Sequence, residues 1–496
     1  MNTKSIYTVF LSVIISAGVS AQKVEWKYST QDNYWKNGKG IKWSDSPEKT
    51  GEVIRISDEK AQYIDGLGGT FNELGWDALC TLPEEKKNEI LFNLFSPKES
   101  NYTYCRMPIG ASDFAMNFYS LNDVVDDFDM INFSIDRDRH ILMRYIKEAQ
   151  KIHPGLKIWA SPWCPPAWMK TNNHYASEYD NSPVNHNGLP QKRALELPTT
   201  GFKMQPGYLD AYALYFTKFV QAYEKEGIKI EAVNIQNEPC STQKYASCTW
   251  RPEDMAYFIG KFLGPKFEKE NIQTEIFFGT INRDNPQYTK TALDDPAASK
   301  YIKGVGFQWD GKGAIPTIHK EYPHLKMMHT EAECGNGSND WGAAEHTWWQ
   351  ISHYMRNGAR VFTYWNMILD QNGISPWGWK QNSLITINTE NGDVTYHPEF
   401  YLMKHLCHYI VPGAYRLQTP DNQENILAFE NPDGKITVMI VNRENQEKNM
   451  VSNDKQDKLL MEMCIKHLTQ YAAMIKIDRG TQGDESIGRL KKMIGE

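Results

Sequence analysis

The ten residues Ile230–Pro239, IEAVNIQNEP, decide the fold that this sequence predicts. Read as a β-strand, they place small and polar side chains on one face (Ala232, Asn234, Gln236, Glu238) and Val233, Ile235 and Asn237 on the other. Such a strand, with its polar face ending in a carboxylate, is typical of a (β/α) barrel, where C-terminal strand ends carry the chemistry. The alternative is that Asn-Glu-Pro merely ends a strand, because Pro239 cannot continue a ladder.

A second stretch, Leu325–Gly335 or LKMMHTEAECG, supplies a partner carboxylate. Met327, His329 and Glu331 share one strand face, so this apolar run also ends in an inward-pointing glutamate. Glycoside hydrolysis uses such a pair, and retention of configuration requires carboxyl groups about 5–5.5 Å apart. Glu333 has the same parity and is the rival nucleophile, but it lies past the strand end, so we favour Glu331.

Composition restricts the functional class. The chain has 496 residues, 41% of them hydrophobic, which is enough for one large domain and one small one. A net charge of -7 argues against nucleic-acid binding, which needs an excess of Lys and Arg. The sequence has no HExxH motif, no zinc-spaced Cys/His cluster and no phosphate-binding loop followed by Lys, so no metal or cofactor is predicted.

Residues 1–21 have the features of a signal peptide. Lys4 provides a positive start, Ile6–Ile15 a short apolar run, and Val19-Ser20-Ala21 a cleavage site. No later run is long enough to span a bilayer, so we expect a secreted or periplasmic protein without an integral membrane segment. Cys240 and Cys248 flank one loop and could pair in an oxidising compartment or remain free thiols.

The chain divides into four further segments. Residues 22–62 contain short alternating runs that predict strands of a small β unit. Residues 63–410 repeat a strand and a helix eight times, which predicts an α/β fold with a (β/α)8 TIM barrel, a doubly wound sheet being the alternative. Residues 411–450 contain two alternating runs joined at Pro432-Asp433-Gly434, which predict a β-sandwich shared with the N-terminal strands.

The last segment, residues 451–496, breaks this pattern. LLMEMCIKHLTQYAAMIKI has helical spacing, and we find no strand pattern in it. We therefore expect an atypical helical or disordered tail that leaves a sandwich edge uncovered.

Polar and aromatic side chains recur at the predicted strand ends, where they should meet on one rim. Besides the two glutamates, the candidates for substrate binding are Arg106, Asp113, Trp163, Asn237, Gln308, Trp309 and Trp365. The loop Met169–Pro206 is too long for a simple connection, which favours a cleft wall over an insertion without a role.

These motifs resemble glycoside hydrolase family 30. The resemblance runs from about Val24 to Asn449 through GLGGTFNELGWDAL, YCRMPIGASDF, WASPWCPPAWMKTN, NIQNEP, HTEAECG and YWNMILD. It implies a retaining β-glycosidase with Glu238 as the general acid/base and Glu331 as the nucleophile. It also implies that the seven residues named above line the pocket for the sugar at the cleaved bond, with Asn237 on its 2-hydroxyl.

Two features indicate a branch of the family. Gln308-Trp309-Asp310 stands where glucosylceramidase has His-Trp-Tyr, and the loop CSTQKYASCTW resembles that of the β-1,6-glucanases. The loops NNHYASEYDNSPVNHNG and CSTQKYASCTW are polar, whereas a lipid substrate would require apolar side chains around the mouth. We therefore expect an endo-β-1,6-glucanase acting on a β-glucan. The alternatives are a glucosylceramidase or exo-β-glucosidase, a xylan-active enzyme, and a non-catalytic carbohydrate-binding protein.

Overall fold

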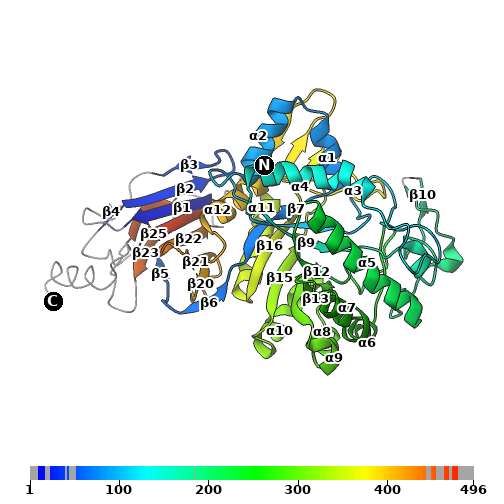
Figure 1. Ribbon diagram of the computed structural model, residues 1–496. Helices are drawn as coiled ribbons and strands as arrows, with labels where there is room; N and C mark the ends of the chain where they lie inside the picture. The colour runs from blue at the N-terminus through cyan, green and yellow to red at the C-terminus, as the bar shows by residue number, and fades with distance from the viewer. Residues whose placement is uncertain are drawn as a thin grey trace.

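A computed structural model describes residues 9–16, 23–38, 42–43, 52–183, 185–442, 448–453, 463–468 and 472–478. These residues form two parts, a barrel with surrounding helices and a β-sandwich on one side of it (Figure 1). The sandwich carries both the bluest and the reddest strands of the ribbon, because it is built from the two ends of the chain. The predicted α/β fold with a side sandwich is confirmed.

The barrel is closed and consists of eight parallel strands. In spatial order they are β12 (Ile230–Asn234), β13 (Glu275–Ile281), β14 (Ile302–Gln308), β15 (Lys326–Glu331), β16 (Ala359–Asn366), β7 (Gly66–Thr70), β8 (Tyr104–Pro108) and β9 (Lys157–Ser161). The eightfold alternation of strand and helix predicted over residues 63–410 is confirmed as a closed barrel, and its strands are apolar runs because parallel strands are buried on both faces. Gly68 allows β7 to approach β8 closely, since a Cβ there would lie 2.6 Å from the carbonyl oxygen of Tyr104.

Helices surround the strands and bury one face each against them. They are α1 (Glu73–Cys80), α2 (Glu84–Phe95), α3 (Asp136–His140), α4 (Leu142–Ile152), α5 (Pro206–Lys225), α6 (Pro252–Phe258), α7 (Gly264–Lys269), α8 (Pro286–Leu293), α9 (Pro296–Ser299), α10 (Ile315–Glu321), α11 (Trp341–Arg356) and α12 (Pro398–Tyr409). Short helical turns lie at η1 (Ala167–Met169), η2 (Gln191–Arg193), η3 (Ile259–Leu263, π-helical) and η4 (Trp309–Gly313). No helix of the described residues has the length and apolar character needed to cross a membrane.

Small sheets complete the loops: β10 (Asn181–Ser182) pairs with β11 (Asn185–His186), and β17 (Ile368–Asp370), β18 (Ile385–Ile387) and β19 (Val394–Tyr396) form a three-stranded sheet. Inside the barrel, one buried layer comes from six strands and comprises Tyr104, Trp159, Ala232, Phe277, Met328 and Val361. Layered side chains of this kind fill barrels of this type. The guanidinium of Arg106 lies 4.9 Å from the ring of Trp159, so the layer lies directly beneath this arginine.

The sandwich has two sheets. The larger has the order β3 (Lys36–Asn37), β2 (Lys23–Ser29), β1 (Val9–Ser16), β25 (Ala472–Asp478), β22 (Lys435–Asn442), β21 (Ile426–Glu430), β20 (Tyr415–Leu417) and β6 (Lys60–Tyr63). The smaller has the order β4 (Lys42–Trp43), β24 (Met463–Leu468), β23 (Lys448–Asn453) and β5 (Glu52–Arg55). The predicted sandwich of N- and C-terminal strands is therefore confirmed.

The prediction of a helical or disordered tail over residues 451–496 is wrong where the structure describes this segment. Residues 463–468 and 472–478 form strands, and β25 pairs antiparallel with β22 over Ala473–Asp478. The helical spacing of apolar residues in LLMEMCIKHLTQYAAMIKI therefore did not exclude strand pairing. Residues 472–478 form a strand because the edge of β22 offers unpaired backbone N–H and C=O groups, with which β25 forms hydrogen bonds. Residues 454–462, 469–471 and 479–496 lie outside the described residues.

Part of the predicted signal peptide, Val9–Ser16, forms strand β1 beside β2, β22 and β25. Strand β25 also pairs directly with β2, at Trp26↔Ile475 and Ser29↔Ala472.

Candidate active site

Glu238 reaches the barrel rim through a bend rather than at the end of a regular strand. Strand β12 ends at Asn234, and a single bridge between Asn237 and Thr280 continues the pairing. Glu238 has φ 47°, a left-handed conformation that is uncommon outside glycine. Strand parity places Asn237 and Glu238 on opposite faces, but this bend directs both into the same site, so the parity prediction is wrong beyond Asn234.

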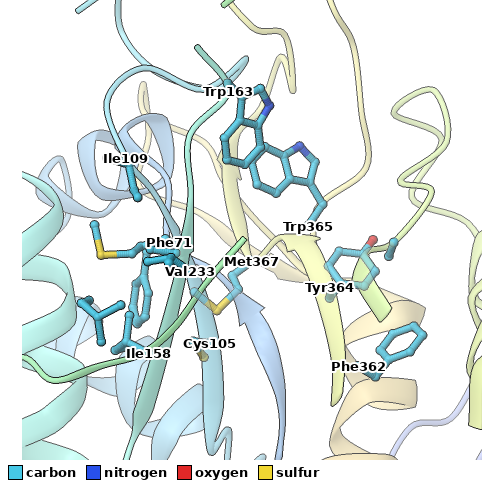
Figure 2. Close-up of a cluster of buried hydrophobic side chains, with 14 of the residues drawn as sticks. Phe71, Cys105, Ile109, Ile158, Trp163, Val233, Phe362, Tyr364, Trp365 and Met367 are labelled. Carbon is cyan, nitrogen blue, oxygen red and sulfur yellow. The ribbon is translucent and has the colours of Figure 1, made fainter. Parts of the chain in front are cut away.

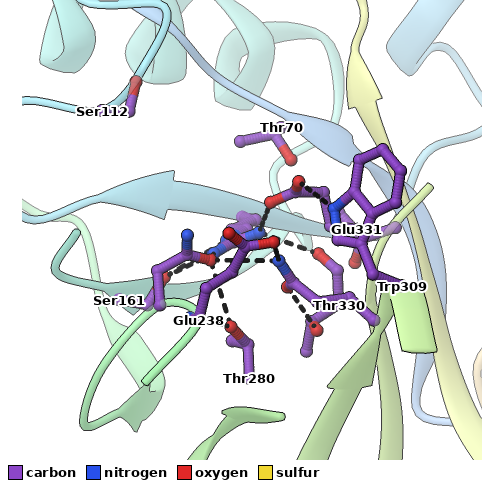
Figure 3. A network of polar contacts seen from close by, with 12 residues as sticks. Thr70, Ser112, Ser161, Glu238, Thr280, Trp309, Thr330 and Glu331 are labelled. Atoms are coloured by element: carbon purple, nitrogen blue, oxygen red, sulfur yellow. Dashed lines mark hydrogen bonds and ion pairs between the residues drawn. The ribbon is translucent and has the colours of Figure 1, made fainter. Parts of the chain in front are cut away.

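Arg106, fully buried in the middle of β8, connects three neighbouring elements. Its Nη1 donates to Glu331 Oε2 at 2.8 Å, its Nη2 to Asn237 Oδ1 at 2.6 Å and its Nε to Ser161 Oγ at 3.2 Å. Figure 3 shows the network of polar contacts around Glu238 and Glu331 to which these bonds belong. Because a guanidinium has rigid geometry, this arginine fixes the carboxyl of Glu331 relative to Asn237.

The two glutamates have different hydrogen-bond partners. Glu331 also accepts from Trp309 Nε1 at 3.3 Å. Glu238 Oε1 accepts from Gln308 Nε2 at 3.3 Å, and the Gln308 amide is oriented by Thr330 Oγ1, which donates to its Oε1 at 2.9 Å. Glu331 thus lies beside a permanent cation, whereas neutral amides contact Glu238.

Burial raises the pKa of three acids in this site, and neighbouring carboxylates add to the shift for Glu238 and Asp113. Burial, followed by the charge of Glu331, raises the pKa of Glu238 to about 7. Burial also raises the pKa of Glu331, although Arg106 opposes the shift. Burial and the charges of both glutamates raise the pKa of Asp113 well above its usual range. For Glu238, burial is a larger cause of the raised pKa than the neighbouring carboxylate.

Two indoles and Arg106 form one wall. The rings of Trp163 and Trp365 stack with centroids 5.0 Å apart, as Figure 2 shows. The Arg106 guanidinium lies 4.2 Å from the Trp163 ring. Among the described residues, neither Trp365 Nε1 nor Asp113 Oδ1 has a hydrogen-bond partner, although both are buried. Such unsatisfied groups beside the acids suit a ligand rich in hydroxyls.

Glu333, the rival to Glu331, has other partners. Its carboxylate pairs with Lys312 Nζ at 2.7 Å and with His346 Nε2 at 2.8 Å. Although burial opposes the shift, hydrogen bonds from His346 and Lys312 lower the pKa of Glu333 to about 2. It contacts none of Arg106, Trp309 and Gln308 by hydrogen bonding in the described structure, whereas all the predicted site residues gather around Glu238 and Glu331.

Sequence patterns did not reveal several residues of the site. Ser161, Thr280 and Thr330 support Arg106, Asn237 and Gln308, and Gln243 donates to Glu238 Oε2 at 3.3 Å. Hydroxyl side chains that support other residues have no sequence motif, but a position near the C-terminal end of a barrel strand gives a partial indication that a residue belongs to the site. Cys240 and Cys248, close to this site, are free thiols. In the described part of the chain, no group of three or more His, Cys, Asp or Glu side chains could hold a metal ion.

The long loop Met169–Pro206 packs against the loop that follows Glu238. The ammonium of Lys170 is fully buried and donates to the carbonyl oxygens of Tyr175, Ala176 and Ser247. Ser177 N and Glu178 N donate to Gln243 O at 3.0 and 2.9 Å. The loop therefore supports the residues around Glu238, as expected of a wall rather than of an insertion without a role.

The loop after β8 carries exposed apolar side chains. Val124, Val125 and Ile131 are 47%, 67% and 78% exposed. Because it follows the C-terminal end of a barrel strand, it lies on the same face as the two glutamates. Trp168 Nε1 donates to Asn122 O at 3.1 Å, which connects this loop to the segment after β9.

Known proteins share this architecture. Solved structures with the same fold include SrfJ from Salmonella typhimurium (TM-score 0.77, 24% identity) and an endo-β1,6-glucanase (TM-score 0.75, 21% identity). Each covers 96% of this chain and 100% of its own. At these identities the likeness concerns the fold alone.

Sequence relatives carry two kinds of name. A Caenorhabditis elegans protein named as glucosylceramidase 1 is 31% identical over 414 residues, which are 78% of this chain and 75% of that protein. An endo-1,6-beta-D-glucanase of Aspergillus fumigatus is 28% identical over 404 residues, 77% of this chain and 78% of that protein. The glycosyl hydrolase family 30 TIM-barrel domain matches residues 64–410, and the family's beta sandwich domain matches residues 413–462. The chain therefore belongs to glycoside hydrolase family 30, whose members act on carbohydrates.

Proposed function

We propose that this chain is a retaining β-glycosidase in which Glu331 is the nucleophile and Glu238 the general acid/base. The observation that carries the proposal is the unequal environment of the two buried carboxyls. Arg106 and Trp309 contact Glu331, whereas burial raises the pKa of Glu238 to about 7. Double displacement needs one ionised carboxyl as nucleophile and one protonated carboxyl as acid, and the two environments favour this division.

The reaction takes two displacements at one carbon. In the first, the Glu331 carboxylate attacks the anomeric carbon, the bond to the leaving oxygen breaks, and that oxygen takes the proton of Glu238. A covalent glycosyl ester on Glu331 results. Glu238, now ionised, removes a proton from water, whose oxygen attacks the same carbon and releases Glu331 as carboxylate, so the configuration is retained. Asn237, held by Arg106 and Thr280, is positioned for the sugar 2-hydroxyl, and Trp163, Trp365 and Asp113 for the ring.

For the substrate we propose a β-1,6-linked glucan that is cut internally. The support is the sequence Gln308-Trp309-Asp310, the polar loops around Glu238, and the similarity to an endo-1,6-beta-D-glucanase. Gln308 in particular supplies a neutral amide to Glu238. Purified protein should release short oligosaccharides from a β-1,6-glucan such as pustulan. A panel of β-1,3-, β-1,4- and β-1,6-glucans and xylan, with products identified, tests this, and release of glucose alone would contradict the internal cut.

A glucosylceramidase is the second candidate. The exposed Val124, Val125 and Ile131 would suit an amphiphilic substrate, and several relatives carry that name. Glucosylceramide in mixed micelles should be included in the panel. If it is preferred over pustulan, and if replacing the three apolar residues by Ser reduces only the lipid activity, the second candidate replaces the first.

We also propose that the protein is exported, with residues 1–21 as a cleaved leader. The charge of Lys4 and the short apolar run support it, and β2 pairs directly with β25 as well as with β1. N-terminal sequencing of protein recovered outside the cytoplasm should begin near Gln22, and an intact Met1 would contradict export by this leader.

A further inference from the structure

A third amide-bearing side chain, besides Asn237 and Gln308, meets the site: that of Gln243. Gln243 lies five residues after Glu238, and its Nε2 donates to Glu238 Oε2 at 3.3 Å. Gln308 donates to the other oxygen of the same carboxyl at 3.3 Å. Glu238 is therefore held between two neutral donors that come from different parts of the chain.

The backbone of Gln243 is fixed independently of Glu238. Its carbonyl oxygen accepts from Ser177 N, Glu178 N and Ser247 Oγ at 3.0, 2.9 and 3.1 Å. The buried Lys170 binds the carbonyls on both sides of this junction, at Ala176 and Ser247. A side chain held by such support is preorganised, because its own order does not depend on the group that it contacts.

Gln308 cannot replace this contact. Thr330 orients its amide, and the same Nε2 also lies 3.3 Å from Asn237 Oδ1, so it is shared between two acceptors. In the described hydrogen bonds, the side-chain amide of Gln243 contacts Glu238 alone. Its removal should therefore free one oxygen of the carboxyl and leave the other restrained.

We infer that Gln243 is a positioning residue that orients the Glu238 carboxyl for proton transfer and helps to stabilise its ionised form. The inference rests on the proposed role of Glu238. A donor to the ionised form opposes the effect of burial, so its loss should move the protonation of Glu238 to higher pH. Loss of orientation should slow reactions that need a proton on the leaving group, and spare those that do not.

The test compares Gln243→Met, which keeps length but cannot donate, with Gln191→Met at an exposed position of the neighbouring loop. Full-length enzymes would be assayed across pH on aryl glycosides of a β-1,6-linked glucose disaccharide with good and poor leaving groups. For Gln243→Met we expect the alkaline limb of kcat/KM to rise by about half a pH unit. We also expect about a tenfold or greater loss for the poor leaving group, with little loss for the good one.

Gln243→Glu provides a second measurement, because an added like charge should move the alkaline limb further upward. Thermal unfolding of every variant checks that the fold is intact. Equal losses for both leaving groups, with an unmoved limb, would assign Gln243 a merely structural role and overturn the inference. If the wild-type enzyme cleaves none of these glycosides or the glucans, the proposed function fails instead.

Discussion

Exchanging Glu331 for Gln should abolish turnover without weakening the fold. Glu333→Gln should lower the stability of the fold and leave turnover intact. The two residues are two positions apart and share strand parity, so each is the matched control for the other. Glu331 accepts from Arg106 and Trp309 in the site, whereas Glu333 pairs with Lys312 and His346.

The expected magnitudes follow from the opposite pKa shifts. Burial raises the pKa of Glu331 even beside Arg106, so folding disfavours its charge and a neutral amide should leave the free energy of unfolding equal or higher. Arg106 retains its bonds to Asn237 and Ser161. An amide cannot attack the anomeric carbon, so kcat should fall by about 10⁴-fold or more.

For Glu333 the sign is reversed. Its pKa falls from 4.5 to about 2, which corresponds to about 3 kcal/mol at 1.36 kcal/mol per unit. The carboxylate is partly open to solvent, which screens the pair, so we expect Glu333→Gln to cost about 1–2 kcal/mol. Because the folded-state pKa is lowered, this contribution is complete above pH 4.5 and is lost as the pH falls to about 2.

Urea unfolding at pH 7 and pH 3, with turnover of the preferred glucan, measures both quantities on the same preparations. The stability difference between wild type and Glu333→Gln should shrink at pH 3, while that variant remains active. Full activity of Glu331→Gln, or an inactive Glu333→Gln of unchanged stability, would refute the reasoning and transfer the nucleophile role to Glu333.

Three other outcomes are expected. The carboxyl groups of Glu238 and Glu331 should lie about 5–5.5 Å apart in a crystal structure, and NMR of the first-formed product should show retained configuration. A gap near 9 Å with inversion would exclude the nucleophile role of Glu331. Because the acid form of Glu238 is lost above its pKa of about 7, kcat/KM should decline with an apparent pKa near 7 in a pH profile, and Glu238→Gln should lack this limb. Arg106→Lys should lower the free energy of unfolding by about 3 kcal/mol and reduce kcat, measured by urea unfolding and turnover, because an ammonium cannot contact Glu331, Asn237 and Ser161 together.

The barrel could be predicted from the sequence because its strands are short apolar runs separated by long amphipathic ones. Strand β15 ends at Glu331, where the sequence predicts the end of the apolar run, since this polar residue and the glycines that follow mark its end. Between α3 and α4 the backbone of Ile141 leaves the helical region, and local helical propensity does not predict this break.

The predicted site residues come together, but their geometry could not be predicted. Periodicity holds only while a strand continues, and β12 stops at Asn234, so the directions of Asn237 and Glu238 depend on the bend at φ 47°. Residues 472–478 form a strand because β22 offers an edge, which is information from a distant part of the chain. Gln243 has a role only through its contacts with Glu238 and the loop at Ser177, and no pattern in CSTQKYASCTW identifies it.

The larger sheet of the sandwich pairs segments that leave the ribosome at very different times. Tyr63 of β6 pairs with Tyr415 of β20, so an early segment has no partner until the barrel has left the ribosome. During that interval β6 exposes unpaired amides to solvent and to other nascent chains. Joining ends so distant in sequence carries a large loop entropy cost, which makes slow, late docking of the side domain the expected rate-limiting event in folding.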